Sequence, residues 1–187
     1  MFKIVTAPNP VLSGTAKPVV KVDKDIVKII EEMKETLLAT TDPKGVGLAA
    51  PQVGKSLKIF IAKPTDNSKI YVFINPEIIE KSLDTSLVER PKKDKSKKAS
   101  KKLEGCLSLP NIWGPVRRAS SLTLSYLDEK GQHHEEKFFN FMATIIQHEM
   151  DHLKGNLFPK KVLEQKGILY KSSKNKKGED EFEEIEI

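Results

Sequence analysis

The sequence predicts one α+β domain in which short, mostly antiparallel strands pack around a central helix. Two segments place apolar residues at helical spacing, and five others are short strand-like runs separated by turn residues. No internal repeat and no second-domain linker divides the chain. Helices and strands that occupy separate stretches around one core are typical of the α+β class.

Composition limits the possible classes of protein. The 187 residues are 38% hydrophobic, with 10 Gly and 11 Pro, which excludes collagen-like and wholly disordered chains. No apolar run approaches the roughly 18 residues that span a bilayer, so we expect no membrane partner. Cys106 is the single cysteine, which excludes an internal disulfide and agrees with a reducing compartment. We therefore expect a cytoplasmic protein, with an organellar location left open.

The first expected helix covers residues 24–39. Apolar residues recur at helical spacing from Ile26 to Leu37, and Asp23 stands where an N-cap is expected. The pattern then changes to short β-rich runs, and residues 129–131 predict a turn between the last two of them. The expected strands lie within residues 57–63, 70–79, 82–89, 120–128 and 133–141.

A second helix is expected over residues 141–154, with Asn140 as its N-cap and Gly155 just past its end. It contains His148 and His152, which are about 40° apart around a helix axis and one turn apart along it. Both imidazoles can therefore reach one divalent ion. This pattern predicts that the central helix of the fold binds a metal.

A third ligand decides what kind of metal site this is. A long metzincin motif would place its ligand at Phe158, which cannot bind a metal, and Glu164 is only 12 residues beyond His152. Cys106 lies upstream in E-G-C-L-S-L-P, and a thiolate with two imidazoles leaves one position open for water. Glu149, beside the histidines, could take a proton from such a water. Alternatively, Cys106 is a small buried apolar residue.

Residues 45–52 form a glycine-rich segment, G-V-G-L-A-A-P-Q. Its G-x-G-x-x-A spacing matches a dinucleotide-binding fingerprint, but it follows a helix rather than a strand, and Pro51 interrupts the helix that should come next. The glycines instead indicate an extended segment that lies against a ligand, with Gln52 offering an amide donor, or else a simple structural turn.

The net charge of +6 is concentrated in one segment. Residues 90–102 carry one Arg, seven Lys and one Asp, so the rest of the chain is close to neutral, which argues against a DNA-binding protein. This segment is expected to be a surface loop, or alternatively a tether to phosphate on RNA. The C-terminal tail is also highly charged, although Phe182, Ile185 and Ile187 alternate as in an edge strand.

Three separated motifs together resemble those of the peptide deformylase family. They are G-V-G-L-A-A-P-Q at 45–52, E-G-C-L-S at 104–108 and H-E-M-D-H at 148–152, in the family's order and without a substitution. The resemblance implies a peptide deformylase-like fold. It also implies a hydrolase of protein biosynthesis that releases formate from the N-terminal formylmethionine of new polypeptides. Residues 1–165 would be its catalytic domain and residues 166–187 a charged extension.

The resemblance further implies a role for each site residue. The metal ligands would be Cys106, His148 and His152. The ion would be Fe²⁺, with Zn²⁺, Ni²⁺ or Co²⁺ able to substitute and water as fourth ligand. Glu149 would act as base and then as acid, while the Gln52 amide and the Leu107 N–H would hold the oxyanion. The substrate contacts would be Val46, Gly47, Phe141 and Ile145.

Two other functions stay open at this point. One is a ribosome- or RNA-associated binding protein that uses residues 90–102 and carries a non-catalytic metal site; an open metal position argues against it, since structural zinc sites are usually closed. The other is a zinc endopeptidase. For the deformylase, the expected partners are N-formylmethionyl nascent peptides and, through residues 90–102, the ribosome.

Overall fold

The computed structural model describes residues 1–89, 102–176 and 178–186. The helices are α1 (Lys24–Ala39), α2 (Asn140–Leu153) and α3 (Phe158–Glu164), with two 3₁₀ turns, η1 (Pro10–Leu12) and η2 (Ala50–Val53). The strands are β1 (Gly47–Ala49), β2 (Ile59–Ala62), β3 (Tyr71–Lys81), β4 (Thr85–Ser86), β5 (Glu104–Cys106), β6 (Leu109–Gly114), β7 (Arg118–Ala119), β8 (Ser121–Leu127), β9 (His133–Phe139), β10 (Tyr170–Lys174) and β11 (Asp180–Glu184).

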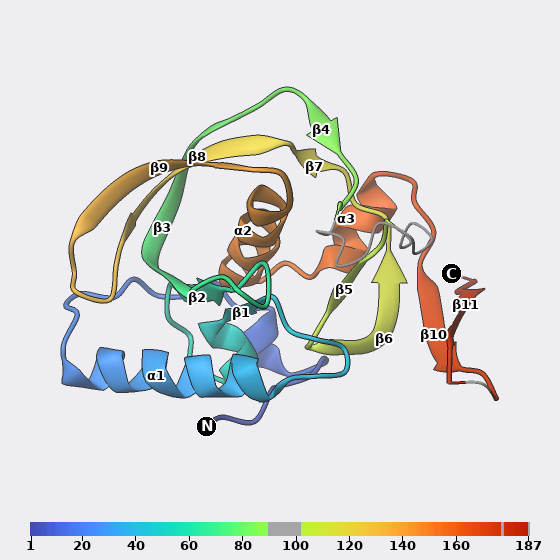
Figure 1. Ribbon diagram of the computed structural model, residues 1–187, viewed down its shortest axis with the longest axis horizontal. Helices are drawn as coiled ribbons and strands as arrows, with labels where there is room; N and C mark the ends of the chain where they lie inside the picture. The colour runs from blue at the N-terminus through green and yellow to red at the C-terminus, as the bar shows by residue number, and fades with distance from the viewer. Residues whose placement is uncertain (90–101, 177, 187) are drawn as a thin grey trace.

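The strands form three sheets around α2. One sheet has the order β1-β2-β3-β8-β9, another β11-β10-β6-β5, and the third consists of β4 and β7. Each pair of these strands is antiparallel. Figure 1 shows α2 in the middle of the molecule, with the five-stranded sheet on one side and β5 and β6 on the other. The predicted α+β class with a central helix is confirmed.

The strand β2 shows how two cores are built on one sheet. Its four residues are all buried, and they alternate between the two faces. Phe60 packs in the cluster that includes α2 residues such as Ile146, whereas Ile59 packs in the cluster that includes α1 residues such as Met33. The sheet is therefore covered by α2 on one face and by α1 on the other, which explains why β2 is a continuous apolar run.

The two long helices lie where the sequence predicts them. The Asp23 side chain caps α1 by accepting hydrogen bonds from two backbone N–H groups of the first turn. The prediction that Asn140 caps α2 is wrong. Asn140 is the first residue of α2, has a left-handed φ of 51°, and donates its backbone N–H to the Ser120 carbonyl at 2.8 Å. Asparagine tolerates this conformation, which turns the chain from β9 directly into α2.

The remaining predictions differ in outcome. Four of the five expected runs contain β2, β3, β8 and β9, but residues 82–89 contain only the two-residue β4. The strands β5, β6, β7 and β10 are not predicted, because β5 and β7 have only two or three residues, and β6 and β10 lack a run of alternating apolar residues. The tail does pair through β11, which contains Phe182. Of the basic segment 90–102, residues 90–101 lie outside the described residues.

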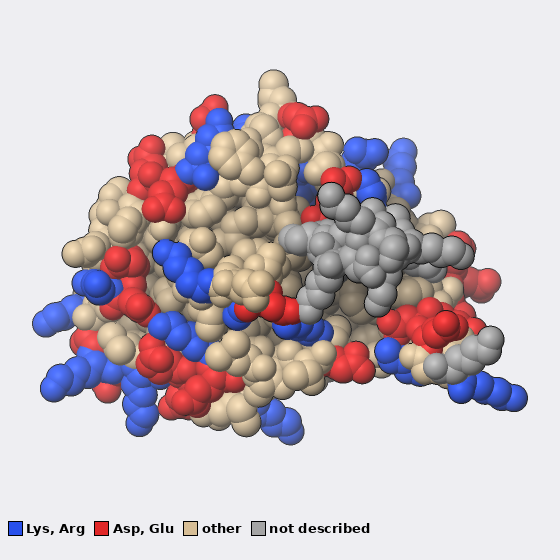
Figure 2. Space-filling view, in the orientation of Figure 1, with Lys and Arg blue, Asp and Glu red and all other residues tan. Residues whose placement is uncertain are grey.

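The surface charges and the helices of the described residues agree with the expectations from the sequence. Figure 2 shows acidic and basic side chains interspersed over the described part of this face. No helix within residues 1–89, 102–176 and 178–186 is long and apolar enough to cross a membrane.

Candidate metal centre

The last residue of β5 lies beside the two histidines of α2. The Sγ atom of Cys106 is 3.2 Å from Nε2 of His152, and one ligand atom each from Cys106, His148 and His152 lies within 4.8 Å of the others. Two ligands of a tetrahedral ion at about 2.0–2.3 Å are about 3.3–3.8 Å apart, so the cluster has to contract by about 1 Å to hold one ion. A thiolate with two imidazoles is also a donor set that suits a divalent transition metal.

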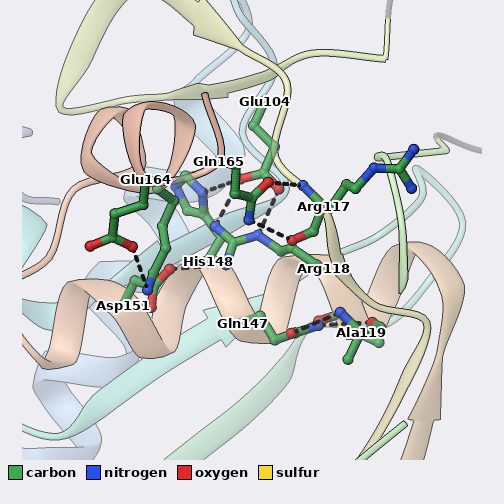
Figure 3. Close-up of polar contacts among 11 residues, drawn as sticks. Glu104, Arg117, Arg118, Ala119, Gln147, His148, Asp151, Glu164 and Gln165 are labelled. Carbon is green, nitrogen blue, oxygen red and sulfur yellow. Dashed lines mark hydrogen bonds and ion pairs between the residues drawn. The ribbon is translucent and has the colours of Figure 1, made fainter. Parts of the chain in front are cut away.

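The His148 ring is oriented by a carboxylate behind it. Its Nδ1 atom lies 3.1 Å from Oε2 of Glu104, as Figure 3 shows. A carboxylate accepts a hydrogen bond from Nδ1–H, and this leaves Nε2 as the ring atom available to a metal.

Arg118 in turn holds Glu104. Its Nε donates to Oε1 of Glu104 at 2.6 Å and its Nη2 donates to Oε2 at 2.9 Å, while Nη1 donates to Oδ2 of Asp151 at 2.9 Å. Burial alone would raise the pKa of Glu104, but the Arg118 charge and the hydrogen bonds from His148 and Arg118 outweigh it and lower the pKa to about 2. Glu104 therefore stays ionised and acts as a fixed acceptor behind the histidine.

The sequence predicts neither Glu104 nor Asp151 as a site residue, although both lie within the quoted motifs. The sequence likewise predicts no role for Arg118. The available signal was that charged residues stand inside segments expected to be buried, and buried charges need partners. Which charges pair depends on how β5, β7 and α2 meet, so the sequence alone leaves the partners undefined.

Glu149 faces the cavity from a tightly packed position. It is 3% exposed, and its Oε2 has no hydrogen-bond partner among the described residues. Burial raises its pKa to about 7, against the opposing charges of His148 and Arg118. A side chain on Gly47 would collide with the Glu149 carboxylate and would lie 2.9 Å from Cγ2 of Ile145. Glycine at residue 47 therefore lets β1 pass directly over the carboxylate.

The two histidines differ in their proton affinity. Burial lowers the pKa of His152 well below its usual range, and the nearby His148 and Arg118 charges lower it further. Burial also acts to lower the pKa of His148, but hydrogen bonds with Cys106 and Glu104 raise it well above its usual value. A metal held by the Cys106 thiolate would replace the His148 proton, because a ligating imidazole must be neutral.

Gln52 is brought to the cluster by η2. Its Oε1 accepts from the Ala49 backbone N–H at 2.8 Å, and its Nε2 lies 3.6 Å from the Cys106 sulfur and 3.3 Å from the Ser108 hydroxyl. The amide is thereby fixed with its N–H₂ group toward the cysteine. Leu107 lies between Cys106 and Ser108 and lines the same cavity.

A cavity of ≈ 100 Å³, which opens to solvent, joins these groups. Of the site residues predicted from sequence, all except His152 line it. His152 lies behind the lining and is 1% exposed. The lining of this one cavity thus includes part of the first motif, two apolar side chains of α2 and the expected proton carrier, namely Val46, Gly47, Phe141, Ile145 and Glu149. This arrangement can hold a metal, polarise a carbonyl group and move a proton beside it.

Known proteins are similar to this chain in sequence and in fold. The polypeptide deformylase family matches residues 1–167. A peptide deformylase of Pseudothermotoga lettingae is 41% identical over 156 residues, which are 83% of this chain and 80% of that protein. The crystal structure of the peptide deformylase from Thermotoga maritima has a TM-score of 0.73 and 35% identity, covering 86% of this chain and 97% of that one. That of the Synechococcus elongatus deformylase, in complex with actinonin, has a TM-score of 0.73 and 31% identity, covering 86% and 78%.

Proposed function

The chain belongs to the polypeptide deformylase family, and on that basis we propose that its cysteine–histidine cluster is the metal centre of the family's reaction. As a member, the chain is a hydrolase that removes the formyl group from formylmethionyl peptides. Family membership favours this activity over the zinc endopeptidase and the non-catalytic binding protein that the motifs left open.

Cys106, His148 and His152 hold the metal in this proposal. Their mutual distances and the carboxylate behind His148 support it. The bound ion supplies a Lewis acid that lowers the pKa of a water molecule. We propose Fe²⁺ on the strength of the resemblance, with Zn²⁺, Ni²⁺ or Co²⁺ able to replace it, because thiolate and imidazole donors accept all four. Metal analysis of protein purified without oxygen tests this identity, and a predominance of zinc there would contradict it.

Glu149 carries the proton in the proposed reaction. It accepts the proton of the attacking water as the new C–O bond forms at the formyl carbon. It then gives the proton to the amide nitrogen as the C–N bond breaks, which releases formate and a free amino terminus. The buried Oε2 has no hydrogen-bond partner among the described residues, and this supports the role. A buried acceptor of this kind is available to a water molecule that donates its proton.

Two N–H donors stabilise the negative charge that develops on the formyl oxygen. One is the Gln52 amide, whose Nε2 is turned toward Cys106, and the other is the backbone N–H of Leu107. Gln52 is preorganised by its bond from Ala49, so it does not have to rotate during the reaction. Loss of one such donor typically reduces the rate by about 10²- to 10³-fold.

The substrate backbone is proposed to pair with the first motif. Within the part of the chain that the structure describes, β1 is an edge strand of the five-stranded sheet and pairs with β2. An extended peptide can add to such an edge, so Val46 and Gly47 are the expected backbone contacts. Phe141 and Ile145, both on α2 and both lining the cavity, form the proposed apolar wall for the methionine side chain.

The remaining predictions rest on the sequence. We propose residues 1–165 as the catalytic domain and residues 166–187 as an extension; the family match to residues 1–167 supports this division. Contact of residues 90–102 with the ribosome stays a prediction, because residues 90–101 lie outside the described residues. The cytoplasmic location also stays a prediction.

Formate release from a short N-formylmethionyl peptide tests the proposed mechanism. Anaerobically prepared, iron-loaded protein is compared with Glu149→Ala, and bound metal is measured in both. We expect the variant to keep its metal and to lose about 10²- to 10⁴-fold in kcat, as removal of a general base does. An Asp25→Ala variant, changed on the exposed first turn of α1, is the control. Normal turnover by Glu149→Ala would exclude the assigned role.

A further inference from the structure

The cavity has a deep end and a mouth, which differ in burial. Its deep lining includes Gln52, Cys106 and Glu149, all buried. Pro43 and Lys44, which also line it, are exposed, and Trp113 is half-buried. A formyl group must sit at the deep end to react, so the peptide that follows the first residue has to leave past the mouth. Trp113 is the large aromatic side chain on that route.

Trp113 is held against the protein by contacts on three sides. Its six-membered ring lies against Gly105, where a Cβ atom would be 2.7 Å from the ring carbons. Its Nε1–H donates to the hydroxyl of Ser172 at 2.9 Å. The Phe182 ring meets it edge-on, with centroids 6.1 Å apart and planes at 76°. Gly105 thus makes room for the indole, while Ser172 and Phe182 determine where it stays.

Ser172 and Phe182 both belong to the C-terminal hairpin of β10 and β11. They are direct cross-strand partners, so the hairpin presents them together. The hairpin joins the sheet through β6, where Tyr170 pairs with Trp113. Figure 1 shows β10 and β11 at the outer edge of this sheet, beyond β6. The hairpin therefore meets the cavity lining at Trp113, through side-chain contacts and backbone pairing.

We propose that Ser172 and Phe182 of the C-terminal hairpin are positioning residues, which hold the Trp113 indole where it binds the peptide segment following the formylated residue. The proposal rests on the proposed function. In this proposal the ligand is a formylated peptide whose chain continues past its second residue to the mouth of the cavity. The indole offers a flat apolar surface at low conformational cost, which suits varied peptide side chains.

The first test separates binding at the mouth from chemistry at the deep end. Formate release is measured for N-formylmethionyl peptides of two and of four residues with Ser172→Ala, Phe182→Ala and the parent. We expect KM for the longer peptide to rise about fivefold in each variant, because each variant loses a hydrogen bond or a ring contact that holds the indole. The value of kcat should stay within about twofold of the parent. The shorter peptide should behave as with the parent. The matched control is Ser173→Ala, changed at the next residue of β10, which is exposed.

The second test reports the position of the indole without any turnover. Trp113 is the single tryptophan, so intrinsic fluorescence comes from this ring alone. Ser172→Ala and Phe182→Ala should each make its emission about twice as sensitive to acrylamide quenching, since each variant removes a contact that shields the ring. Titration with the deformylated tetrapeptide should change the parent emission, and Ser173→Ala should match the parent.

The outcomes distinguish the two proposals. No formate release from either peptide by the parent would overturn the proposed function and, with it, the peptide-binding role of the mouth. Normal turnover by the parent with equal KM changes for both peptide lengths would overturn only the positioning role. Quenching that is unchanged in Ser172→Ala and Phe182→Ala would also overturn it, because the hairpin would then not hold the ring.

Discussion

Glu104 at the metal end is bound by a bidentate arginine and a histidine, whereas the contacts of Trp113 at the mouth, among the described residues, include a hydrogen bond and a ring contact from the C-terminal hairpin. The first arrangement is buried and charged, and the second is half-buried and neutral. Buried charges lose much energy when a partner is removed, while neutral contacts lose little. Substitutions at the metal end should therefore affect the whole fold, and those at the mouth should affect peptide binding in a graded way.

Removal of the arginine should produce the largest change. Arg118→Met leaves Glu104 buried without its bidentate partner, so we expect a loss of about 3–5 kcal/mol in the free energy of unfolding. Urea unfolding measures it. Arg117→Met is the matched control, because residue 117 is exposed, and it should change stability by less than about 0.5 kcal/mol. Equal stability of the two variants would contradict the contrast between the two ends.

A methyl group at Gly47, which lies against Glu149, should have the second-largest effect. We expect this effect on the catalytic rate. Gly47→Ala places Cβ against the carboxylate and 2.9 Å from Ile145. Displacement of the proton-transfer group by about 1 Å typically costs about 10²-fold, so we expect that loss in kcat. Gly14→Ala, where Cβ would be 3.9 Å from its nearest neighbour, is the control. Full activity of Gly47→Ala would mean that the carboxylate can move freely.

Acid should weaken the metal end through Glu104. Its pKa in the folded protein is about 2, below the ordinary 4.5, so its contribution to stability is complete above pH 4.5 and is lost as the pH falls toward 2. In Glu104→Gln, the slope of the free energy of unfolding against pH in this window should fall by up to about 1.4 kcal/mol per pH unit. This value corresponds to the uptake of one proton on unfolding. Urea unfolding at several pH values between 2.5 and 4.5 measures the slope. An unchanged slope would show that Glu104 does not titrate there.

The smallest change is expected at the mouth. Trp113→Phe keeps an aromatic ring but loses the N–H bond to Ser172, so KM for a formylated tetrapeptide should rise about threefold to fivefold. The double variant with Ser172→Ala should show little further increase, because the same bond is absent in both single variants. Steady-state kinetics of the four proteins give the coupling. Fully additive effects would indicate that the two side chains act independently.

Much of the site could be predicted because its parts are local in the sequence. The ends of α1 follow from apolar spacing and an aspartate cap, and the histidine pair follows from the pitch of α2. The N-cap of α2 could not be predicted in this way. Asn140 has the right residue type, but its backbone is decided by the hydrogen bond to Ser120, which lies between β7 and β8.

The sequence by itself determined the two long helices, the apolar runs of the main sheet and the chemistry of three motifs. Only the tertiary structure decided that Glu104 faces Arg118 and His148, and that the hairpin carrying Ser172 meets Trp113. The physical reason is the range of the interactions. Helical spacing and caps act within a few residues, whereas these contacts join residues 14 to 59 positions apart. Contacts of that range form only when β5, β6, β7, β10 and α2 have packed, because packing is what aligns their side chains.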